Sequence, residues 1–235
     1  MARVHKRYFT ILGSLYAGLW AVLAIAPWDR PTWALENALT VVAAGLLFLT
    51  RRAFPFSKAS YVLWFAFLTL HAIGAHYVYA KVPYDAWFQS VFSWSPDAAF
   101  GWERNHYDRL VHFAYGLLLA HPARVGDAQH DLARGFWGYF VPFLFVVASS
   151  AIFELLEWFA ALVFGAGLGD TYLGSQGDPW DAQKDMALAT LGALIALAVI
   201  AAIQARLRRD FGREWSDSLR VKQRQPVEVV PEAGG

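Results

Sequence analysis

Residues 177–203 read GDPWDAQKDMALATLGALIALAVIAAI, which places three carboxylates at the head of an apolar run long enough to cross a membrane. An ionisable group at membrane depth costs about 2.5 kcal/mol or more unless it is paired or hydrated, so it indicates a functional site. Other segments must supply partners for these carboxylates, and we expect His112, Glu154 and Glu157 to be among them.

The composition indicates an all-α membrane protein. Of the 235 residues, 57% are hydrophobic and 17% are charged, and eleven are tryptophan, which is typical of chains that cross a membrane several times. The chain has no cysteine, which excludes disulfides, thiolate zinc sites and cysteine nucleophiles. Any metal must therefore be held by oxygen and imidazole ligands. The net charge of +1 gives no indication of a nucleic-acid partner, and we expect none.

The apolar runs predict six transmembrane helices in a bundle, which form one domain over residues 1–205. The fourth run is long enough only if its helix begins near Asn105, where an Asn followed by an acid three residues later is typical of a helix N-terminus. The first run is longer than a signal-peptide core, so we expect it to be retained. Residues 206–235 are expected to form a partly disordered cytoplasmic tail. The predicted spans are residues 8–26, 33–50, 59–80, 105–121, 136–164 and 179–205.

Lysine and arginine in the connections predict the orientation of the spans. With the N-terminus in the cytoplasm, fifteen basic residues fall on the inner side and five on the outer side. Both termini are then cytoplasmic, and we expect a multi-pass protein of the bacterial inner membrane.

An amphipathic helix is predicted between the third and fourth spans. Its apolar residues recur at helical spacing, at Tyr84, Trp87, Phe88, Val91 and Phe92. Such a helix suits the membrane interface, where Trp and Tyr are favoured. Two interpretations stay open, a plain interfacial anchor and a lid over a substrate site.

Acids and histidines within the predicted spans recur in pairs, and each pair lies on one face of its helix. The pairs are Asp108 with His112, Glu154 with Glu157, and Asp181 with Asp185. The topology brings all of them to the outer ends of their helices. A divalent cation would offset their mutual repulsion. Mixed nitrogen and oxygen ligands suit zinc, manganese or iron, whereas carboxylates with carbonyls and water suit magnesium or calcium.

Simpler interpretations also account for several of these groups. Helix caps or first-turn acids explain Asp178, Asp181, Asn105 and Asp108. A metal-free ion-pair network could form with the cations Arg109 and Lys184. Hydrogen bonds between helices are the more common use of lone membrane histidines such as His71 and His76. Together with His106, Asp178 and Lys184, His76 remains a candidate member of the polar site.

Three motifs carry a resemblance to a known family, and they read NHYDRLVHFAYG (105–116), FELLEW (153–158) and LGSQGDPWDAQKDM (173–186). Together they resemble the YjdF-type bacterial inner-membrane proteins, a family of unknown function, over about residues 8–205. More distantly, the chain is similar to the VanZ-like membrane proteins associated with glycopeptide-antibiotic tolerance. That likeness falls on Asp108, Arg109, His112, Glu154 and Asp185. Neither resemblance implies a known mechanism.

These observations favour a metal-dependent enzyme that acts on a lipid-linked or amphipathic envelope substrate. In this hypothesis His112, Glu154 and Asp185 hold the ion, with Asp181 and Asp108 as further candidate ligands. Glu157 acts as a general base and Arg109 stabilises anionic charge. The alternatives are a non-catalytic binder or transporter of a lipid or envelope precursor, and a structural scaffold in the membrane.

Overall fold

The computed structural model describes residues 3–51, 56–127, 135–164 and 174–207, and in these ranges the chain forms eight helices and no strand. The predicted tail, apart from its first two residues, lies outside the described residues. The helices are α1 (Arg3–Leu23), α2 (Arg30–Thr50), α3 (Lys58–His76), α4 (Tyr84–Phe92), α5 (Pro96–Phe100), α6 (Tyr107–Asp127), α7 (Trp137–Phe164) and α9 (Asp181–Leu207).

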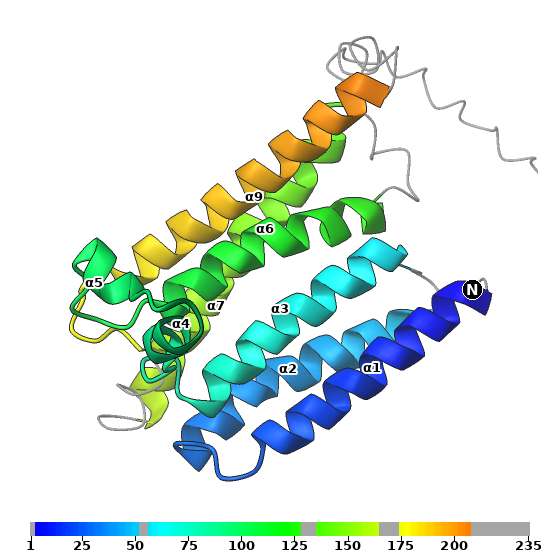
Figure 1. Ribbon diagram of the computed structural model, residues 1–235. Coiled ribbons are helices and arrows are strands. Elements are labelled where there is room, and N and C mark those ends of the chain that lie inside the picture. Colours follow the sequence, from blue (N-terminus) through cyan, green and yellow to red (C-terminus); the bar gives the residue numbers. More distant parts are fainter. Residues whose placement is uncertain (1–2, 52–55, 128–134, 165–173, 208–235) are drawn as a thin grey trace, which may run out of the picture.

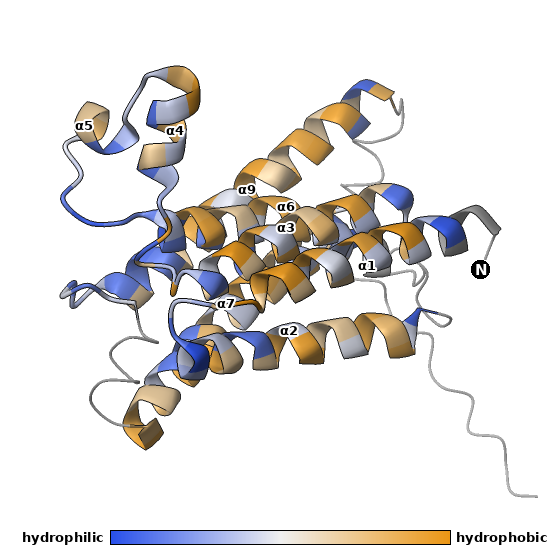
Figure 2. Ribbon diagram, turned by 60° about the horizontal axis from the view of Figure 1, so that its bottom comes forward, coloured by the Kyte–Doolittle hydropathy of each residue, from blue (hydrophilic) through white to orange (hydrophobic). Residues whose placement is uncertain are grey.

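The six long helices run side by side, and the short helices α4 and α5 lie at one end of the bundle (Figure 1). The helices α1 and α2 both pack against α3, and α6 packs against α3, α7 and α9. Helix α3 therefore joins an N-terminal group of three helices to a C-terminal group of three. The helix bodies are hydrophobic, whereas the loops around α4 and α5 are largely hydrophilic (Figure 2).

Four of the described helices are long and apolar enough to cross a membrane, namely α2, α3, α7 and α9. The all-helical class is confirmed, and the six-span count is not confirmed, because α1 and α6 fall outside this group. Helix α1 begins with three basic residues within its first five positions, and the first two turns of α6 contain Asp108, Arg109 and His112. These polar groups lower the mean hydropathy of two helices that are each 21 residues long.

The third helix ends at His76, so the predicted end of the third span at Ala80 is wrong. Residues 77–80 are apolar enough to extend the hydropathy signal, but the backbone turns there, and Val78 and Tyr79 have φ of 51° and 47°. The turn brings the Tyr79 ring back over Gly74, where a Cβ would lie 2.6 Å from the ring. A side chain at residue 74 therefore has no room.

The helices α6 and α9 approach so closely that their backbones touch. A Cβ at Gly116 would overlap the Ala189 carbonyl oxygen, and a Cβ at Gly192 would overlap the Phe113 carbonyl oxygen. The small residues that recur every four positions along α9 are buried, as predicted for a close helix contact. This contact fixes how the polar ends of α6 and α9 face each other.

The predicted amphipathic helix is present as α4, and most of its apolar face is exposed. Trp87, Phe88, Val91 and Phe92 are all exposed, whereas Tyr84 is buried and donates to Asp97 Oδ1 at 2.7 Å. Burial and this hydrogen bond raise the pKa of Tyr84 to about 12, so its hydroxyl stays protonated. One end of α4 is thus anchored to the bundle, and its large apolar side chains are free to meet lipid.

Candidate functional site

The polar residues gather at the α4 end of the bundle in two groups, which we call the ion-pair layer and the acidic cluster. The ion-pair layer consists of Arg104, Arg109, Asp178, Asp181 and Lys184. The acidic cluster consists of Glu36, Asp108, His112, Glu154, Glu157 and Asp185. The first group ties the entry of α6 to the entry of α9, and the second lies inside the bundle.

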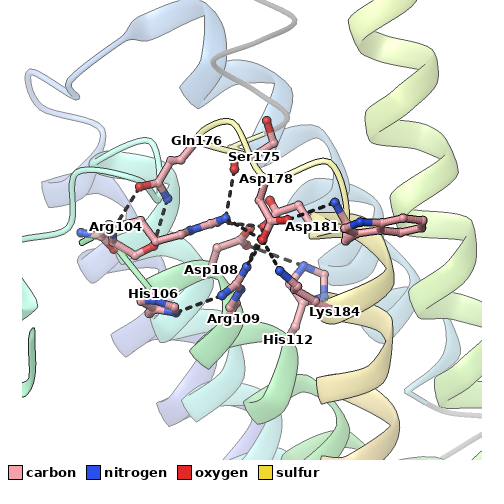
Figure 3. Close-up of polar contacts among 12 residues, drawn as sticks. Arg104, His106, Asp108, Arg109, His112, Ser175, Gln176, Asp178, Asp181 and Lys184 are labelled. Atoms are coloured by element: carbon pink, nitrogen blue, oxygen red, sulfur yellow. Dashed lines mark hydrogen bonds and ion pairs between the residues drawn. The ribbon is translucent and has the colours of Figure 1, made fainter. Parts of the chain in front are cut away.

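Two arginines form ion pairs with two aspartates in the ion-pair layer (Figure 3). Arg104 lies 3.3 Å from Asp178 Oδ2 and 2.8 Å from Asp181 Oδ1, and Arg109 Nη2 lies 2.5 Å and 3.4 Å from the same two oxygens. Lys184 Nζ adds a third cation, 2.6 Å from Asp178 Oδ2. Hydrogen bonds from Lys184, the Trp180 amide and Arg109 lower the pKa of Asp178 to about 2. Asp178 therefore keeps its charge at neutral pH.

Asn105 and Gln176 fasten the loop before α6 to the loop before α9. The Asn105 amide donates to Gln176 Oε1 at 3.0 Å, and Gln176 Nε2 donates back to the Asn105 carbonyl at 2.9 Å. The Asn105 side chain accepts from the Tyr107 amide at 3.0 Å, so it caps α6 two residues before the first helical residue. The predicted capping role of Asn105 is confirmed, with the helix starting slightly later than expected.

Three ligand-type side chains of the acidic cluster converge from α6 and α9. One ligand atom each from Asp108, His112 and Asp185 lies within 4.8 Å of the others. His112 Nε2 lies 3.6 Å from Asp108 Oδ1 and 3.5 Å from Glu154 Oε1, which α7 supplies. All four side chains are buried or nearly buried, and Asp185 is only 2% exposed.

Among the described residues, no lysine or arginine forms an ion pair with the carboxylates of the acidic cluster. Glu157 and Glu36 are buried within electrostatic range of Asp108 and of each other. In the described part of the chain, no lysine or arginine nitrogen lies within 4.0 Å of a carboxylate of this cluster. One oxygen each of Glu36, Glu154 and Asp185 is buried without a hydrogen-bond partner. The cluster therefore contains three buried carboxylate oxygens that lack a hydrogen-bond donor.

His71 and Tyr79 form a buried pair beside Glu36. Tyr79 OH lies 2.5 Å from His71 Nδ1, and His71 Nε2 lies 3.2 Å from the Glu36 backbone carbonyl. Because a carbonyl only accepts, Nε2 carries the ring proton and Nδ1 accepts from the tyrosine. Both ring nitrogens thus have hydrogen-bond partners without a metal. The left-handed backbone at Val78 and Tyr79 turns the chain so that the Tyr79 hydroxyl reaches His71.

A pocket of about 300 Å³ adjoins the acidic cluster. Most of its lining consists of apolar side chains of α2, α3, α6 and α7, among them Leu39, Phe67 and Phe153. Asp108, His112, His71 and Tyr79 also line it. An apolar chain in this pocket would therefore reach two members of the acidic cluster.

Comparison with known proteins gives a family but no function. A family model described as "Predicted membrane protein (DUF2238)" matches residues 8–206. The chain belongs to this family. It is also 39% identical over 194 residues to the inner membrane protein YjdF of Escherichia coli (strain K12), covering 80% of this chain and 86% of that protein. The resemblance to YjdF-type proteins is confirmed, and no solved structure matches the chain significantly.

In this member of the DUF2238 family, the residues predicted from sequence fall into three places. Asp108, His112, Glu154 and Asp185 come together, and Glu157 lies beside them. The ion-pair layer holds Arg109, Asp178, Asp181 and Lys184, so Asp181 is paired with arginines there. Elsewhere, His76 Nδ1 lies 2.7 Å from the Leu23 carbonyl, and the His106 ring packs against Trp102 at an angle of 34°, with 4.3 Å between ring centroids.

Two members of these groups, Glu36 and Arg104, escaped the sequence analysis as site residues, and so did Tyr79, which bonds His71 beside the acidic cluster. Glu36 carried a usable signal, because it is an acid near the start of an apolar helix. Arg104 lies in the connection between α5 and α6, where a charged residue is common and gives no signal of a site. Tyr79 had no signal, since its role depends on a backbone turn.

Proposed function

We propose that the chain is a divalent-metal-dependent enzyme of the inner membrane that acts on a lipid-linked or amphipathic substrate. The observation that carries the proposal is the convergence of Asp108, His112 and Asp185, with Glu154 beside them, in a buried cluster with unpartnered carboxylate oxygens. Four arguments support it, from charge, spacing, ligand chemistry and the adjoining pocket.

The charge argument concerns the carboxylates of the acidic cluster. Burying one unpaired charge costs several kcal/mol, and like charges at close range add to that cost. The three cations nearby are already engaged with Asp178 and Asp181. A bound divalent cation would offset both the burial and the repulsion of Asp108, Glu154 and Asp185.

The spacing argument concerns the contacts of His112 Nε2. Two ligands of one tetrahedral ion, each about 2.0–2.2 Å from it, lie about 3.3–3.6 Å from each other. The observed 3.6 Å to Asp108 and 3.5 Å to Glu154 are longer than good hydrogen bonds and match that separation. These two distances to His112 Nε2 support a shared ion, with Asp108, His112 and Asp185 as the mutually close set and Glu154 in reach of His112 alone.

The ligand set favours certain metals. Carboxylates combined with an imidazole suit zinc, manganese or iron, whereas magnesium and calcium prefer oxygen alone. We therefore expect zinc, manganese or iron to bind more tightly here than magnesium or calcium.

The adjoining pocket supports the substrate class. Its apolar lining suits a hydrocarbon chain, and its polar lining would bring the polar part of the same molecule to Asp108 and His112. Glu157 is placed to accept a proton as a general base, since it is buried beside the cluster. Arg109 lines a different pocket, on the other face of α6, so the predicted role of Arg109 in stabilising anionic charge is not part of this proposal.

The membrane arrangement that we propose has six spans with both termini in the cytoplasm. Helices α1 and α6 run alongside the four candidate spans, and at 21 residues each is about 30 Å long. Because α6 carries its charges into the bundle, its low mean hydropathy does not prevent it from spanning. The excess of basic residues at the two termini and in the second and fourth connections supports this orientation.

The test is metal analysis of protein purified in detergent without chelators. We expect about one equivalent of zinc, manganese or iron per chain, which Asp185→Asn and His112→Leu lose, because each removes a ligand. Glu103→Gln removes an exposed carboxylate away from the cluster and serves as the control. A parent protein that takes up none of these metals, even when they are supplied during purification, would refute the metal site.

A second measurement separates an enzyme from a non-catalytic binder. Glu157→Gln should retain the metal and the fold but lose turnover of lipid-linked phosphates and esters. If Glu157→Gln and the parent turn over every such substrate equally, Glu157 is not the base and the catalytic assignment fails.

A further inference from the structure

A second, larger pocket of about 700 Å³ lies beneath α4 and α5, on the other face of α6. Its α6 lining comes from Arg109, Leu110 and Phe113, whereas the pocket beside the acidic cluster takes Asp108, Val111 and His112 from the same helix. The two pockets are therefore separate, and a ligand of one need not touch the other.

Aromatic and aliphatic side chains form most of the larger pocket. Phe88 of α4 lines it, as do Trp94 and Trp102 from the connections on either side of α5, and Leu188 lines it from α9. Phe88, Trp94 and Trp102 remain more than a third exposed, at 41%, 43% and 37%. Exposed aromatic side chains next to an apolar pocket indicate a surface that a lipid covers.

The charged side chains that line this pocket, Arg109 and Lys184, are both cationic. Asp178 and Asp181 pair with them from the α9 entry, but neither aspartate lines the pocket. Arg109 Nε is buried and has no hydrogen-bond partner. Arg104, Arg109 and Lys184 carry three positive charges against the two negative charges of Asp178 and Asp181, so one positive charge beside the pocket is not offset.

His106 extends the polar end without adding charge. Arg109 Nη1 donates to His106 Nδ1 at 3.4 Å, and burial together with Arg109 and Arg104 lowers the pKa of His106. A neutral imidazole whose Nδ1 accepts from an arginine keeps its other nitrogen as a donor. The polar end thus presents donors from Arg109, Lys184 and His106.

Its position suits the level of lipid head groups. The pocket is lined from α4, α5 and the first turns of α6 and α9. At this end of the bundle, hydrophilic loops meet the hydrophobic helix bodies (Figure 2). The polar end of the pocket sits at the entries of α6 and α9, and Leu110, Phe113 and Leu188 follow along the two helices. A lipid placed with its phosphate at Arg109 and Lys184 would lay an acyl chain along these apolar residues.

We propose that this pocket is a binding site for an anionic phospholipid. The free Arg109 Nε can donate one charge-assisted hydrogen bond to a phosphate oxygen, and lysine binds phosphate as a point charge. A zwitterionic phospholipid would find no acidic side chain among the lining residues for its amine, so the site discriminates by net charge. Helix α4 then covers the lipid site. The bound lipid in turn helps to hold α4 at the membrane interface.

The experiment is native mass spectrometry of the full-length protein, titrated with phosphatidylglycerol or with phosphatidylcholine. We expect phosphatidylglycerol to bind about tenfold more tightly, as one well-placed charged contact would give. Leu188→Trp fills the pocket and should weaken phosphatidylglycerol binding about tenfold. Leu194→Trp, at a 50% exposed position on the same helix outside both pockets, should not.

A charge variant provides a second test that changes little volume. Lys184→Gln should remove most of the preference for phosphatidylglycerol, whereas Lys81→Gln, at another exposed lysine, should keep it. Equal binding of both lipids to the parent, or undiminished phosphatidylglycerol binding by Leu188→Trp, would overturn the proposal. The metal content of the same samples reports separately on the acidic cluster, so failure of one site is not failure of the other.

Discussion

Replacing Gly116 by alanine tests the closest contact in the bundle. A Cβ at this position would overlap the Ala189 carbonyl oxygen and would lie 2.7 Å from the Ala193 amide nitrogen. Both are backbone atoms, so no change of rotamer relieves the clash. That Cβ would lie 1.8 Å from the oxygen, so α6 and α9 must separate there by roughly 2 Å to restore the usual spacing of about 3.5–4.0 Å between non-bonded atoms.

Gly116→Ala should lower the free energy of unfolding by about 3 kcal/mol, the upper end of the usual loss from overpacking. For a chain of this length each kcal/mol lowers the melting temperature by about 2–4 °C, so Gly116→Ala should melt about 6–12 °C below the parent protein. Separation of the two helices also moves Asp108 and His112 away from Asp185. If the acidic cluster holds a metal as we propose, the variant should hold it more weakly.

The assay is thermal unfolding in detergent, followed by the fluorescence of the eleven tryptophans. Gly45→Ala is the matched control, since it makes the same change in α2, where a Cβ would meet nothing within 4 Å. There alanine favours the helix by about 0.5–1 kcal/mol, so the melting temperature should hold or rise slightly. If Gly116→Ala and Gly45→Ala melt together, the backbone contact between α6 and α9 is not as described.

Two further predictions concern single polar contacts. The lowered pKa of Asp178 contributes stability that is present above about pH 4 and is lost as the pH falls toward about 2. Lys184→Met should therefore lose less stability over that window in an acid titration, and an unchanged loss would contradict the ion-pair layer. Tyr79→Phe leaves His71 Nδ1 buried without a donor and should lower the free energy of unfolding by about 1–3 kcal/mol in a denaturant titration. Tyr77→Phe should change it by about 0.5 kcal/mol or less, and equal stability of the two variants would contradict the Tyr79–His71 bond.

Several features of the site followed from helical spacing alone. The i to i+4 spacing put Asp108 and His112 on one face of α6, and these two side chains do face the same cluster. The small residues Ala189 and Ala193 predicted a close helix neighbour, and both are fully buried against α6. Such inferences succeed because a regular helix fixes the relative directions of its own side chains.

Prediction from helical spacing failed where two groups on one helix have different surroundings. Asp181 and Asp185 share a face of α9, yet Asp181 pairs with two arginines and Asp185 lies in the acidic cluster. One turn of helix separates them, and that turn decides between the ion-pair layer and the acidic cluster. Glu36 likewise joins the cluster only because α3 positions α2 beside α6 and α7, which no pattern within α2 reveals.

By itself the sequence determined the helical class, the family, the amphipathic helix and the faces on which the charged groups lie. These are local properties, because periodicity and composition act within one segment at a time. Only the tertiary structure decided which acids are neutralised by arginine and which are left without a cation. That division depends on contacts between residues some seventy positions apart, such as Arg104 with Asp178, and on the glycines that let α6 and α9 touch. The chemistry of the site follows from that division, since only the carboxylates without a cation have oxygens free to bind a metal.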